Sequence, residues 1–504
     1  MKKLLVLLVV LGLCLTGCRL IDFMKTGECP DGAHVDSNDN GTCDNCSKTV
    51  IVVIDMYNVN DLHGKIKPSS SQSGIGALTT YLMGKKNDNT VFLSSGDMWQ
   101  GSAESNLTHG ELITEWMNNL GFVSMTLGNH EYDWGEEYVT SNGELADFPF
   151  LGINVYDTDT GERAEYATPS VTVSRGGVEI GIIGAIGDCY SSISGDVSDG
   201  FEFKVGDELT ELVKAEATRL REDGVDFIVY SLHDGYGRSS TGDKQISDST
   251  FSSYYDTELS NGYVDLVFEG HTHQSYTLRD SHDVYHLQGG GENKGVSYAE
   301  VIINSANGNS KVRSAEIIKA SKWASKAEDP IVTALLAKYS EQISRAEEVL
   351  GSNSTYIDDS VVEQIVADLY YQYGKKKWGN EYTLTLGGGF IRTRNPYNLK
   401  SGTVTYADVY SILPFDNQLV LCSVKGSDLY SKFLVSENED YYVSCGTDIE
   451  LLKNSIDMEA TYYIVTDTYT STFDYNNLTE VVRYDLGVYA RDLLAQYIRE
   501  GNLA

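Results

Sequence analysis

Seven side chains that suit metal binding each follow a short apolar run of the sequence. They are Asp61, His63, Asp97, Asn129, His233, His271 and His273. Carboxylate, amide and imidazole groups bind divalent transition-metal ions, and seven ligands are too many for one tetrahedral ion. The set therefore predicts two ions that share one carboxylate. A lone polar group after a strand is usually part of a solvated turn. Here, however, five of the nine histidines lie directly after these apolar runs when His130 is included, and chance placement explains that poorly.

The apolar runs before these side chains have the length of buried β-strands. They cover residues 49–57, 91–95, 123–127, 227–232 and 264–268. From residue 48 to about 325 such runs alternate with helical stretches, which is typical of an α/β domain. In an open α/β sheet the residues just past the strand ends face a crevice. Strands that lie side by side would therefore bring all seven side chains to one rim.

The whole chain is long and acidic. Its 504 residues predict two to three domains. The formal net charge of −35 argues against binding to a nucleic-acid polymer, because no basic surface could be large. An acidic protein that handles an anionic substrate needs local positive charge, which bound metal ions supply. We expect segments at 1–18, 19–47, 48–325, 326–352 and 353–504.

The first segment is typical of an export signal. Lys2 and Lys3 precede an apolar run over residues 4–14 that is too short to span a bilayer. The sequence Leu-Thr-Gly-Cys that ends at Cys18 resembles a bacterial lipoprotein signal, in which the chain is cut before the cysteine and the cysteine carries lipid. An uncleaved membrane anchor is the alternative. Either interpretation predicts an exported protein, tethered to the outer face of the bacterial cell membrane.

Residues 19–47 offer a second set of ligands. Cys29, His34, Cys43 and Cys46 have the spacing Cys-x4-His-x8-Cys-x2-Cys, which suits a structural zinc ion. The stretch from Asp36 to Gly41 also resembles the start of a calcium loop, but Ser47 stands where such a loop has glutamate. A disulfide-closed spacer is the third alternative. None of the three makes this segment catalytic.

The remaining cysteines are dispersed along the chain. We expect Cys189 to be a buried free thiol. A disulfide between Cys422 and Cys445 is an option that the sequence leaves undecided, because spacing alone does not determine pairing.

The five ligand blocks, in this order, resemble a known family. The motifs Asp-Leu-His-Gly, Gly-Asp, Gly-Asn-His-Glu, His and Gly-His-Thr-His are similar to those of the calcineurin-like metallophosphoesterase domain, in particular its 5′-nucleotidase/UDP-sugar hydrolase branch. The resemblance implies an α/β fold (α+β overall) with a four-layer αββα sandwich. It also implies that Asp61, His63 and His273 hold one ion, that Asn129, His233 and His271 hold the other, and that Asp97 bridges them. The metals themselves, Zn, Mn, Fe or Co, stay open.

His130 and Asp133 are the expected catalytic pair. His130 follows the ligand Asn129 but is not needed as a metal ligand. It can therefore stabilise the negative charge that develops on the phosphoryl or leaving oxygen. Asp133 lies three residues on and can accept a hydrogen bond from the second ring nitrogen. The resemblance implies the same pair, although a structural role for His130 is the alternative. We interpret Glu131 as a structural carboxylate for neighbouring backbone.

A second domain is expected to bind the substrate. The helical spacing of apolar residues over 327–350 predicts one long linker helix that ends at residues 351–354. Beyond it the sequence resembles the 5′-nucleotidase C-terminal domain, smaller and α+β, which implies substrate contacts from Arg392, Phe415, Asn417 and either Phe473 or Tyr475. Plain core packing is the alternative for Phe415.

The match of this second domain is imperfect. The Gly-Gly-Asp-Gly-Tyr block that the family usually has is replaced by residues 472–477. Lys375, Lys376 and Lys377 stand where an arginine is usual, and a lysine is a point charge instead of a planar fork.

These patterns predict a surface-anchored dinuclear-metal phosphohydrolase that converts extracellular nucleotides to nucleoside and phosphate. An alternative is that the protein uses the same metals as a phosphodiesterase or pyrophosphatase that acts on 2′,3′-cyclic nucleotides or UDP-sugars. A non-catalytic surface-binding lipoprotein is the remote alternative, and the complete ligand set argues against it. The expected partners are the nucleotide and, through lipid on Cys18, the membrane.

Overall fold

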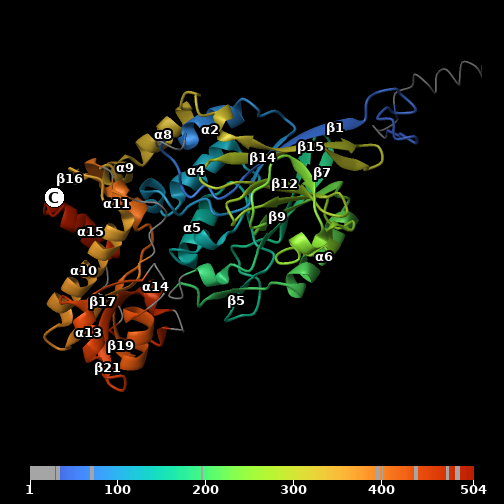
Figure 1. The fold of residues 1–504 in the computed structure, drawn as a ribbon. Helices are drawn as coiled ribbons and strands as arrows, with labels where there is room; N and C mark the ends of the chain where they lie inside the picture. The colour runs from blue at the N-terminus through green and yellow to red at the C-terminus, as the bar shows by residue number, and fades with distance from the viewer. Residues whose placement is uncertain are drawn as a thin grey trace, which may run out of the picture.

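The computed structural model describes residues 29, 34–68, 73–193, 197–391, 398–399, 401–435, 441–472, 476–482 and 488–503. These residues form a larger N-terminal part and a smaller C-terminal part, drawn in red and orange in Figure 1. Cys18, Arg392, Phe473 and Tyr475, which the sequence marked for lipid or substrate, lie outside the described residues. No helix within the described ranges is both long and apolar enough to cross a membrane.

Two sheets form the centre of the N-terminal part. The first has the order β15-β14-β1-β2-β3-β4, and its strands β1 to β4 run parallel. Its strands are β1 (Ile51–Val59), β2 (Thr90–Ser94), β3 (Ser124–Thr126), β4 (Phe150–Leu151), β14 (Gly295–Asn304) and β15 (Ser310–Lys319). The second has the order β10-β12-β13-β11-β9-β7-β6. Its strands are β6 (Ser170–Arg175), β7 (Val178–Ile186), β9 (Phe227–His233), β10 (Asp243–Gln245), β11 (Leu266–Glu269), β12 (Ser275–Arg279) and β13 (Tyr285–Gly289).

The two sheets pack face to face and helices cover their outer faces. One core lies between the sheets and joins side chains of both, such as Ile54 and Leu93 with Ile182 and Phe268. A second core packs α2 (Gly74–Met83) and α4 (Glu111–Leu120) on the first sheet, and a third packs α6 (Asp207–Glu222) on the second sheet. These four layers are the αββα sandwich that the family resemblance implied.

The helices and short strands of this part occupy the connections between the main strands. They are α2 (Gly74–Met83), α3 (Ala103–Asn106), α4 (Glu111–Leu120), η2 (Asn129–Glu131), α5 (Glu136–Leu145), β5 (Val155–Asp157), η3 (Tyr190–Ser192), β8 (Phe201–Phe203), α6 (Asp207–Glu222), α7 (Asp248–Phe251), η4 (Thr257–Ser260) and η5 (Ala320–Lys322).

The five ligand-bearing strands do not lie side by side in one sheet, as the apolar runs alone suggested. β1, β2 and β3 belong to the first sheet, whereas β9 and β11 belong to the second. Because β2 and β9 are buried along their whole length, their sequences are mostly apolar without alternation and carry no signal for the sheet they join. The strand ends still meet, because the sheets approach closely. At Gly184 of β7, an added Cβ would lie 2.2 Å from the Cβ of Leu151 on β4.

The prediction of one long linker helix over residues 327–350 is wrong. The chain instead forms α8 (Pro330–Lys338) and α9 (Ser340–Ala346), separated at Tyr339, and then strand β16 (Val349–Asn353). β16 pairs with the distant strand β18 (Gly402–Thr405), and local periodicity cannot reveal such a long-range pairing. Tyr339 and Ile343 pack in the N-terminal core, while Ala346 packs in the C-terminal core.

A five-stranded sheet of order β20-β17-β21-β19-β22 forms the centre of the C-terminal part. The elements after β16 are α10 (Asp359–Trp378), β17 (Leu384–Phe390), β18, α11 (Tyr406–Ile412), β19 (Leu419–Lys425), α12 (Gly426–Asp428), the π-helical turn η6 (Leu429–Leu434), β20 (Tyr441–Ser444), α13 (Ile449–Ser455), β21 (Thr461–Asp467), α14 (Thr468–Ser471), β22 (Thr479–Val482) and α15 (Ala490–Arg499). Cys422 and Cys445 are both free, so the disulfide left open by the sequence is absent, and Cys189 is the buried free thiol expected.

Candidate metal centre

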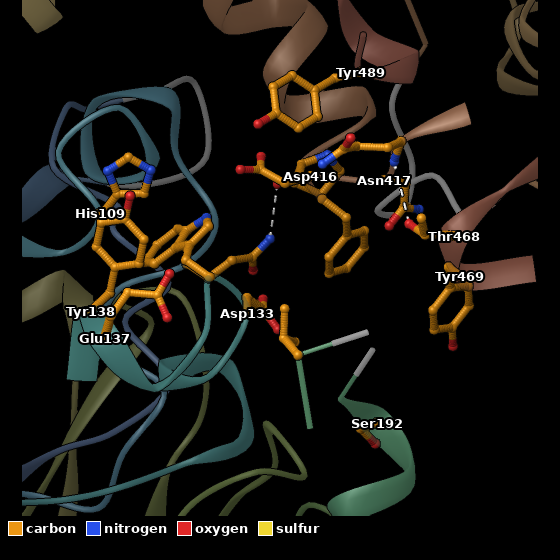
Figure 2. Close-up of a pocket in the computed structure, with 16 residues that line it drawn as sticks. His109, Asp133, Glu137, Tyr138, Ser192, Asp416, Asn417, Thr468, Tyr469 and Tyr489 are labelled. Carbon is orange, nitrogen blue, oxygen red and sulfur yellow. Dashed lines mark hydrogen bonds between the residues drawn. The ribbon is translucent and has the colours of Figure 1, made fainter. Parts of the chain in front are cut away.

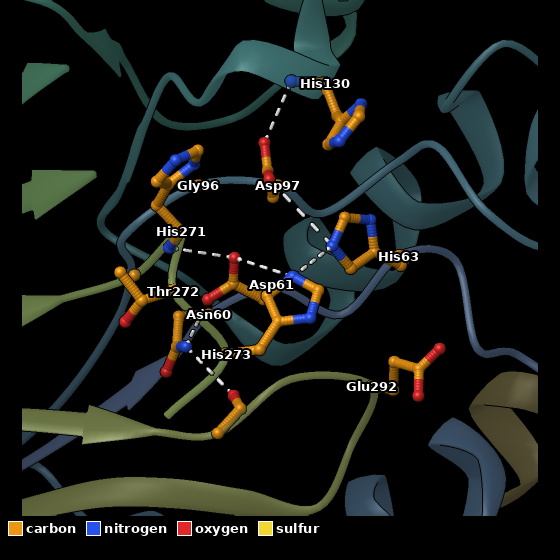
Figure 3. Close-up of polar contacts among 12 residues, drawn as sticks. Asn60, Asp61, His63, Gly96, Asp97, His130, His271, Thr272, His273 and Glu292 are labelled. Atoms are coloured by element: carbon orange, nitrogen blue, oxygen red, sulfur yellow. Dashed lines mark hydrogen bonds and ion pairs between the residues drawn. The ribbon is translucent and has the colours of Figure 1, made fainter. Parts of the chain in front are cut away.

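The seven predicted ligands converge where the strand ends of the two sheets meet. Figure 3 shows Asp61, His63, Asp97, His271 and His273 of this set. Ligand atoms of Asp61, His63, Asp97 and His273 all lie within 4.8 Å of one another, and those of Asp97, His233 and His271 do as well. Asp97 is thus common to both groups. Asn129 joins the second group, because its Oδ1 lies 3.2 Å from His233 Nε2 and 3.0 Å from His271 Nδ1. The arrangement has two adjacent positions for a cation with one carboxylate between them.

The backbone that carries the ligands adopts an unusual conformation. Positive φ angles occur at Asp61 (50°), His63 (49°), Asp97 (55°), His271 (66°) and His273 (55°). These are five of the twelve residues other than glycine with positive φ in the described part of the chain. Each such residue costs on the order of 1–3 kcal/mol and persists only where surrounding structure enforces it. These left-handed conformations occur just after the ends of β1, β2 and β11, where the ligands lie.

Backbone carbonyls fix the orientation of two imidazoles. His63 Nδ1 donates to the carbonyl of Gln100 at 2.8 Å, and His233 Nδ1 donates to the carbonyl of Ser95 at 2.7 Å. Since a carbonyl only accepts, each ring presents the lone pair of Nε2 to the centre when it is neutral. His63 Nε2 then lies 2.9 Å from His273 Nε2. Two ring nitrogens this close need a proton or a shared cation between them, so the donor set fits a divalent metal.

The carboxylates are buried and depend on nearby positive charge. Burial alone raises the pKa of the Asp97 carboxyl, but the charges of His233 and His130 outweigh it and hold this pKa well below its usual range. For His233, burial lowers the pKa, but the Asp97 charge outweighs this effect and raises the pKa to about 10. Burial raises the pKa of Asp61. In His271, burial and the charge of His233 lower the pKa to about 4, so this ring stays neutral, as a metal ligand must be.

Glu131 acts as the structural carboxylate that we expected. Its two oxygens accept hydrogen bonds from the backbone N–H groups of Asp97 (2.9 Å), Met98 (2.8 Å) and Gly128 (2.8 Å). These contacts tie the loop after β2 to the loop after β3, and so they fix Asp97 relative to Asn129. Burial, with the Asp97 charge, raises the pKa of Glu131 to about 7.

Asn60 is a supporting residue to which the sequence assigned no role. Its Nδ2 donates to Asp61 Oδ2 at 2.5 Å and to the carbonyl of Gly290 at 3.0 Å, while its Oδ1 accepts from Gly289 N at 3.1 Å. The side chain therefore connects the end of β1 to the loop after β13. Its position directly before Asp61 was the only available signal, and residue type alone does not distinguish such a role from a turn.

His130 and Asp133 form the expected pair beside the ligands. His130 Nδ1 donates to Asp133 Oδ2 at 2.8 Å, and the His130 backbone N–H donates to Asp97 Oδ1 at 2.9 Å. The imidazole of His130 lies with its centroid 5.3 Å from that of His63. The His130 ring also stacks on the ring of Phe415 in the C-terminal part, at a centroid distance of 6.1 Å and an interplanar angle of 29°.

A cavity of about 290 Å³ opens next to this pair, between the two parts of the chain (Figure 2). Its walls hold several aromatic rings and the polar groups of one loop, and the lining residues include Asp133, Trp134, Tyr138, Phe415, Asp416, Asn417, Tyr469 and Tyr489. The structure thus brings Phe415 and Asn417 to the wall that the sequence predicted. Lys375, Lys376 and Lys377 are exposed at the end of α10 and do not line this cavity.

Tyr469 and Arg491 are among the lining or supporting residues of the C-terminal part that the sequence missed. Tyr469 lines the cavity from α14. Arg491 of α15 is buried behind the loop, where it donates to the carbonyl of Phe415 at 2.8 Å and pairs with Asp416 Oδ1 at 2.5 Å. The Asp416 charge and the Tyr410 hydroxyl outweigh burial and raise the pKa of Arg491, which therefore stays charged. Both residues sit in stretches with no recognisable motif, so only the folded arrangement identifies them.

The two parts are also joined directly at this cavity. Gln100 Nε2 and Asn106 Nδ2 both donate to the carbonyl of Pro414, at 3.2 and 3.0 Å. Because the Gln100 carbonyl accepts from His63, one short segment touches a metal ligand on one side and the Phe415 loop on the other.

Comparison with known proteins agrees with this architecture. Residues 57–275 match the calcineurin-like phosphoesterase family, and residues 342–443 match the 5′-nucleotidase C-terminal domain. Protein UshA of Yersinia enterocolitica is 26% identical over 432 residues, which cover 77% of this chain and 76% of that protein. Endonuclease YhcR of Bacillus subtilis is 27% identical over 418 residues, or 75% of this chain but only 32% of that protein.

A solved structure shares the fold. The 5′-nucleotidase precursor of Thermus thermophilus superposes with a TM-score of 0.65 at 19% identity, covering 89% of this chain and 96% of that one. At this identity the likeness concerns the fold alone.

Proposed function

We propose that this chain, a member of the calcineurin-like metallophosphoesterases that carry a 5′-nucleotidase C-terminal domain, hydrolyses nucleoside 5′-monophosphates to nucleoside and phosphate. Its class, a metal-dependent phosphoester hydrolase, follows from the two domain matches. The observation that carries the nucleotide substrate is the contact between the two parts of the chain. There the Phe415 ring stacks beside His130, so an aromatic wall adjoins the predicted metal ligands.

The cavity suits a nucleoside. Stacking of a base on an aromatic ring is worth about 1–3 kcal/mol, and Phe415 and Tyr469 both line the cavity. Asn417 adds an amide that can donate to and accept from a base edge. Asp133, which lines the same cavity, is bonded to His130, and His130 adjoins Asp97. A nucleotide with its base at Phe415 would therefore direct its phosphate toward the ligand cluster.

The chain's own residues supply positioning and a proton. Two divalent ions held by the seven ligands would polarise the phosphoryl oxygens and lower the pKa of a bound water. Asp133 fixes the His130 ring through Nδ1, so that Nε2 on the opposite edge delivers a hydrogen bond or proton to a substrate oxygen. Arg491 holds the backbone of Phe415, which keeps the base wall in place during turnover.

We further propose that the enzyme works on extracellular nucleotides from the outer face of the bacterial membrane, held by lipid on Cys18. The support is the sequence alone: Lys2 and Lys3, the short apolar run and the Leu-Thr-Gly-Cys motif. Cells that produce the full chain can be fractionated and compared with a Cys18→Ser variant.

Membrane and soluble fractions should be assayed for hydrolysis products, with and without chelator: adenosine and phosphate from AMP, UMP and glucose 1-phosphate from UDP-glucose, and ring-opened adenosine monophosphate from 2′,3′-cyclic AMP. We expect AMP hydrolysis in the membrane fraction, its loss with chelator and its recovery with Mn²⁺ or Zn²⁺. Cys18→Ser should move the activity out of the membrane fraction. Hydrolysis of UDP-glucose or the cyclic nucleotide without hydrolysis of AMP would favour the pyrophosphatase or phosphodiesterase alternative. If no substrate is hydrolysed with metal present, the hydrolase is refuted.

His130→Ala should lower kcat for AMP by about 10²–10⁴-fold, because the variant lacks the group that stabilises or protonates a substrate oxygen. Metal content, measured by elemental analysis, should stay unchanged, since no predicted ligand is lost. His282→Ala, at an exposed histidine in the turn between β12 and β13, is the matched control and should keep full activity. Loss of one metal ion from the His130 variant would instead make His130 a ligand and contradict its assignment.

Phe415→Ala should raise KM for AMP by about tenfold to a hundredfold, which corresponds to the loss of one base-stacking contact. A small aryl phosphate such as 4-nitrophenyl phosphate serves as the control substrate, and its KM should change by less than about threefold. Equal effects on the two substrates would remove Phe415 from the base site and leave it as part of the packing between the two parts.

A further inference from the structure

A second cluster of metal-binding side chains lies in the N-terminal segment, remote from the cavity. The ligand atoms of Cys29, His34, Cys43 and Cys46 all lie within 4.8 Å of one another. Cys29 Sγ is 3.4 Å from Cys43 Sγ, and Cys46 Sγ is 3.4 Å from His34 Nδ1. We propose that these four side chains hold one structural Zn²⁺ ion in a tetrahedral site of their own, separate from the catalytic centre.

The chain between the ligands is folded to present them. Cys43 N donates to the carbonyl of Lys48 at 2.8 Å, and Ser47 N donates to the carbonyl of Cys43 at 2.9 Å. These bonds close a tight turn around residues 43–47, in which Ser47 has a φ of 59°. The turn places Cys43 and Cys46 on one side. Asp44 N donates to the carbonyl of Val35 at 2.7 Å, which brings the His34 end of the segment against the same turn.

The Asp-x-Asn-x-Asn-Gly pattern closes a separate turn over residues 36–42, in which its oxygens accept backbone hydrogen bonds. Asp36 is buried, and its carboxylate accepts from Asn40 N at 3.1 Å and Gly41 N at 2.8 Å. The amide oxygens of Asn38 and Asn40 accept from backbone N–H groups two residues on, at 3.1 and 2.9 Å. Among His, Cys, Asp and Glu side chains described in this segment, Asp36 belongs to no converging group. The oxygens are thus used as turn acceptors, and the ligands that converge are sulfur and nitrogen.

The cluster is anchored on the first sheet. Asn304, at the end of β14, donates from Nδ2 to Asp36 Oδ2 at 2.8 Å and to Asp39 Oδ1 at 2.9 Å. Val50 N donates to the carbonyl of Gly41 at 3.1 Å, just before β1 begins. In Figure 1 this segment lies at the end of β1 and β15 that is turned away from the C-terminal part. An ion here would fasten the segment that precedes the domain to the edge of the sheet, without reaching the substrate cavity.

Zinc explains the ligand set better than a disulfide. All three cysteines are free, and 3.4 Å between the two sulfur atoms far exceeds the S–S bond of about 2.05 Å. A disulfide would join two of the three cysteines and would leave unexplained why the third cysteine and His34 lie in the same cluster. A tetrahedral Cys₃His site uses all four groups, and thiolate with imidazole favours Zn²⁺ over the hard cations Ca²⁺ and Mg²⁺.

Cobalt substitution tests this site independently of catalysis. The full chain, purified in detergent under reducing conditions, should be stripped of metal and titrated with Co²⁺. Because no cysteine is among the seven predicted catalytic ligands, thiolate-to-cobalt charge-transfer absorption in the near ultraviolet reports on the N-terminal cluster alone. We expect this absorption in the unaltered chain, and its displacement by one equivalent of Zn²⁺.

The matched variants separate the two metal sites. Cys43→Ser combined with Cys46→Ser should abolish the charge-transfer absorption and lower zinc content by one ion per chain, with kcat for AMP unchanged. Cys445→Ser, which removes a buried cysteine elsewhere, should retain the absorption. Absence of the absorption in the unaltered chain would overturn the proposal whether or not the variants fold. So would its persistence in the double variant, or an intact mass that is lower by two hydrogens because of a disulfide. None of these results bears on the proposed nucleotidase activity.

Discussion

The buried Asp97 carboxylate is the group around which the other residues of the candidate metal centre are arranged. It is buried where two sheets meet, with His233 Nε2 at 3.3 Å, His63 Nε2 at 3.9 Å and the backbone of His130 bonded to its other oxygen. A second buried carboxylate, Asp61, lies in the same cluster. Removing such charges from water costs several kcal/mol each unless positive charge compensates them. Nearby imidazoles supply some of that charge, and two divalent ions would supply it in full.

Much of the surrounding fold serves to hold these groups in place. Five ligands sit in left-handed backbone conformations that are unfavourable by themselves, so neighbouring contacts must enforce them. Glu131 ties two of the ligand loops together through three backbone hydrogen bonds, and Asn60 ties a third to the loop after β13. The close approach of the sheets at Gly184 brings strand ends from separate sheets to one place. The same rigidity positions His130 between Asp97 and the ring of Phe415.

The sequence predicted which side chains converge, because each one carries its own local signal, a polar group directly after an apolar run. It could not assign the strands to sheets, since β2 and β9 are buried on both faces and look alike. It also merged α8, α9 and β16 into one helix, because the pairing of Val349–Asn353 with Gly402–Thr405 depends on residues some fifty positions away. Arg491 and Tyr469 were missed for the same reason: their roles exist only once distant segments meet. For the N-terminal cysteines, spacing left three alternatives, and the convergence of four donors favours zinc among them.

The most direct test of the central claim is a crystal structure of the full chain grown with Mn²⁺, with anomalous scattering recorded to locate the ions. We expect two anomalous peaks in contact with the carboxylate of Asp97. One should also contact Asp61, His63 and His273, and the other should contact Asn129, His233 and His271. A single peak, or two peaks of which only one touches Asp97, would contradict the claim that Asp97 bridges two metal ions.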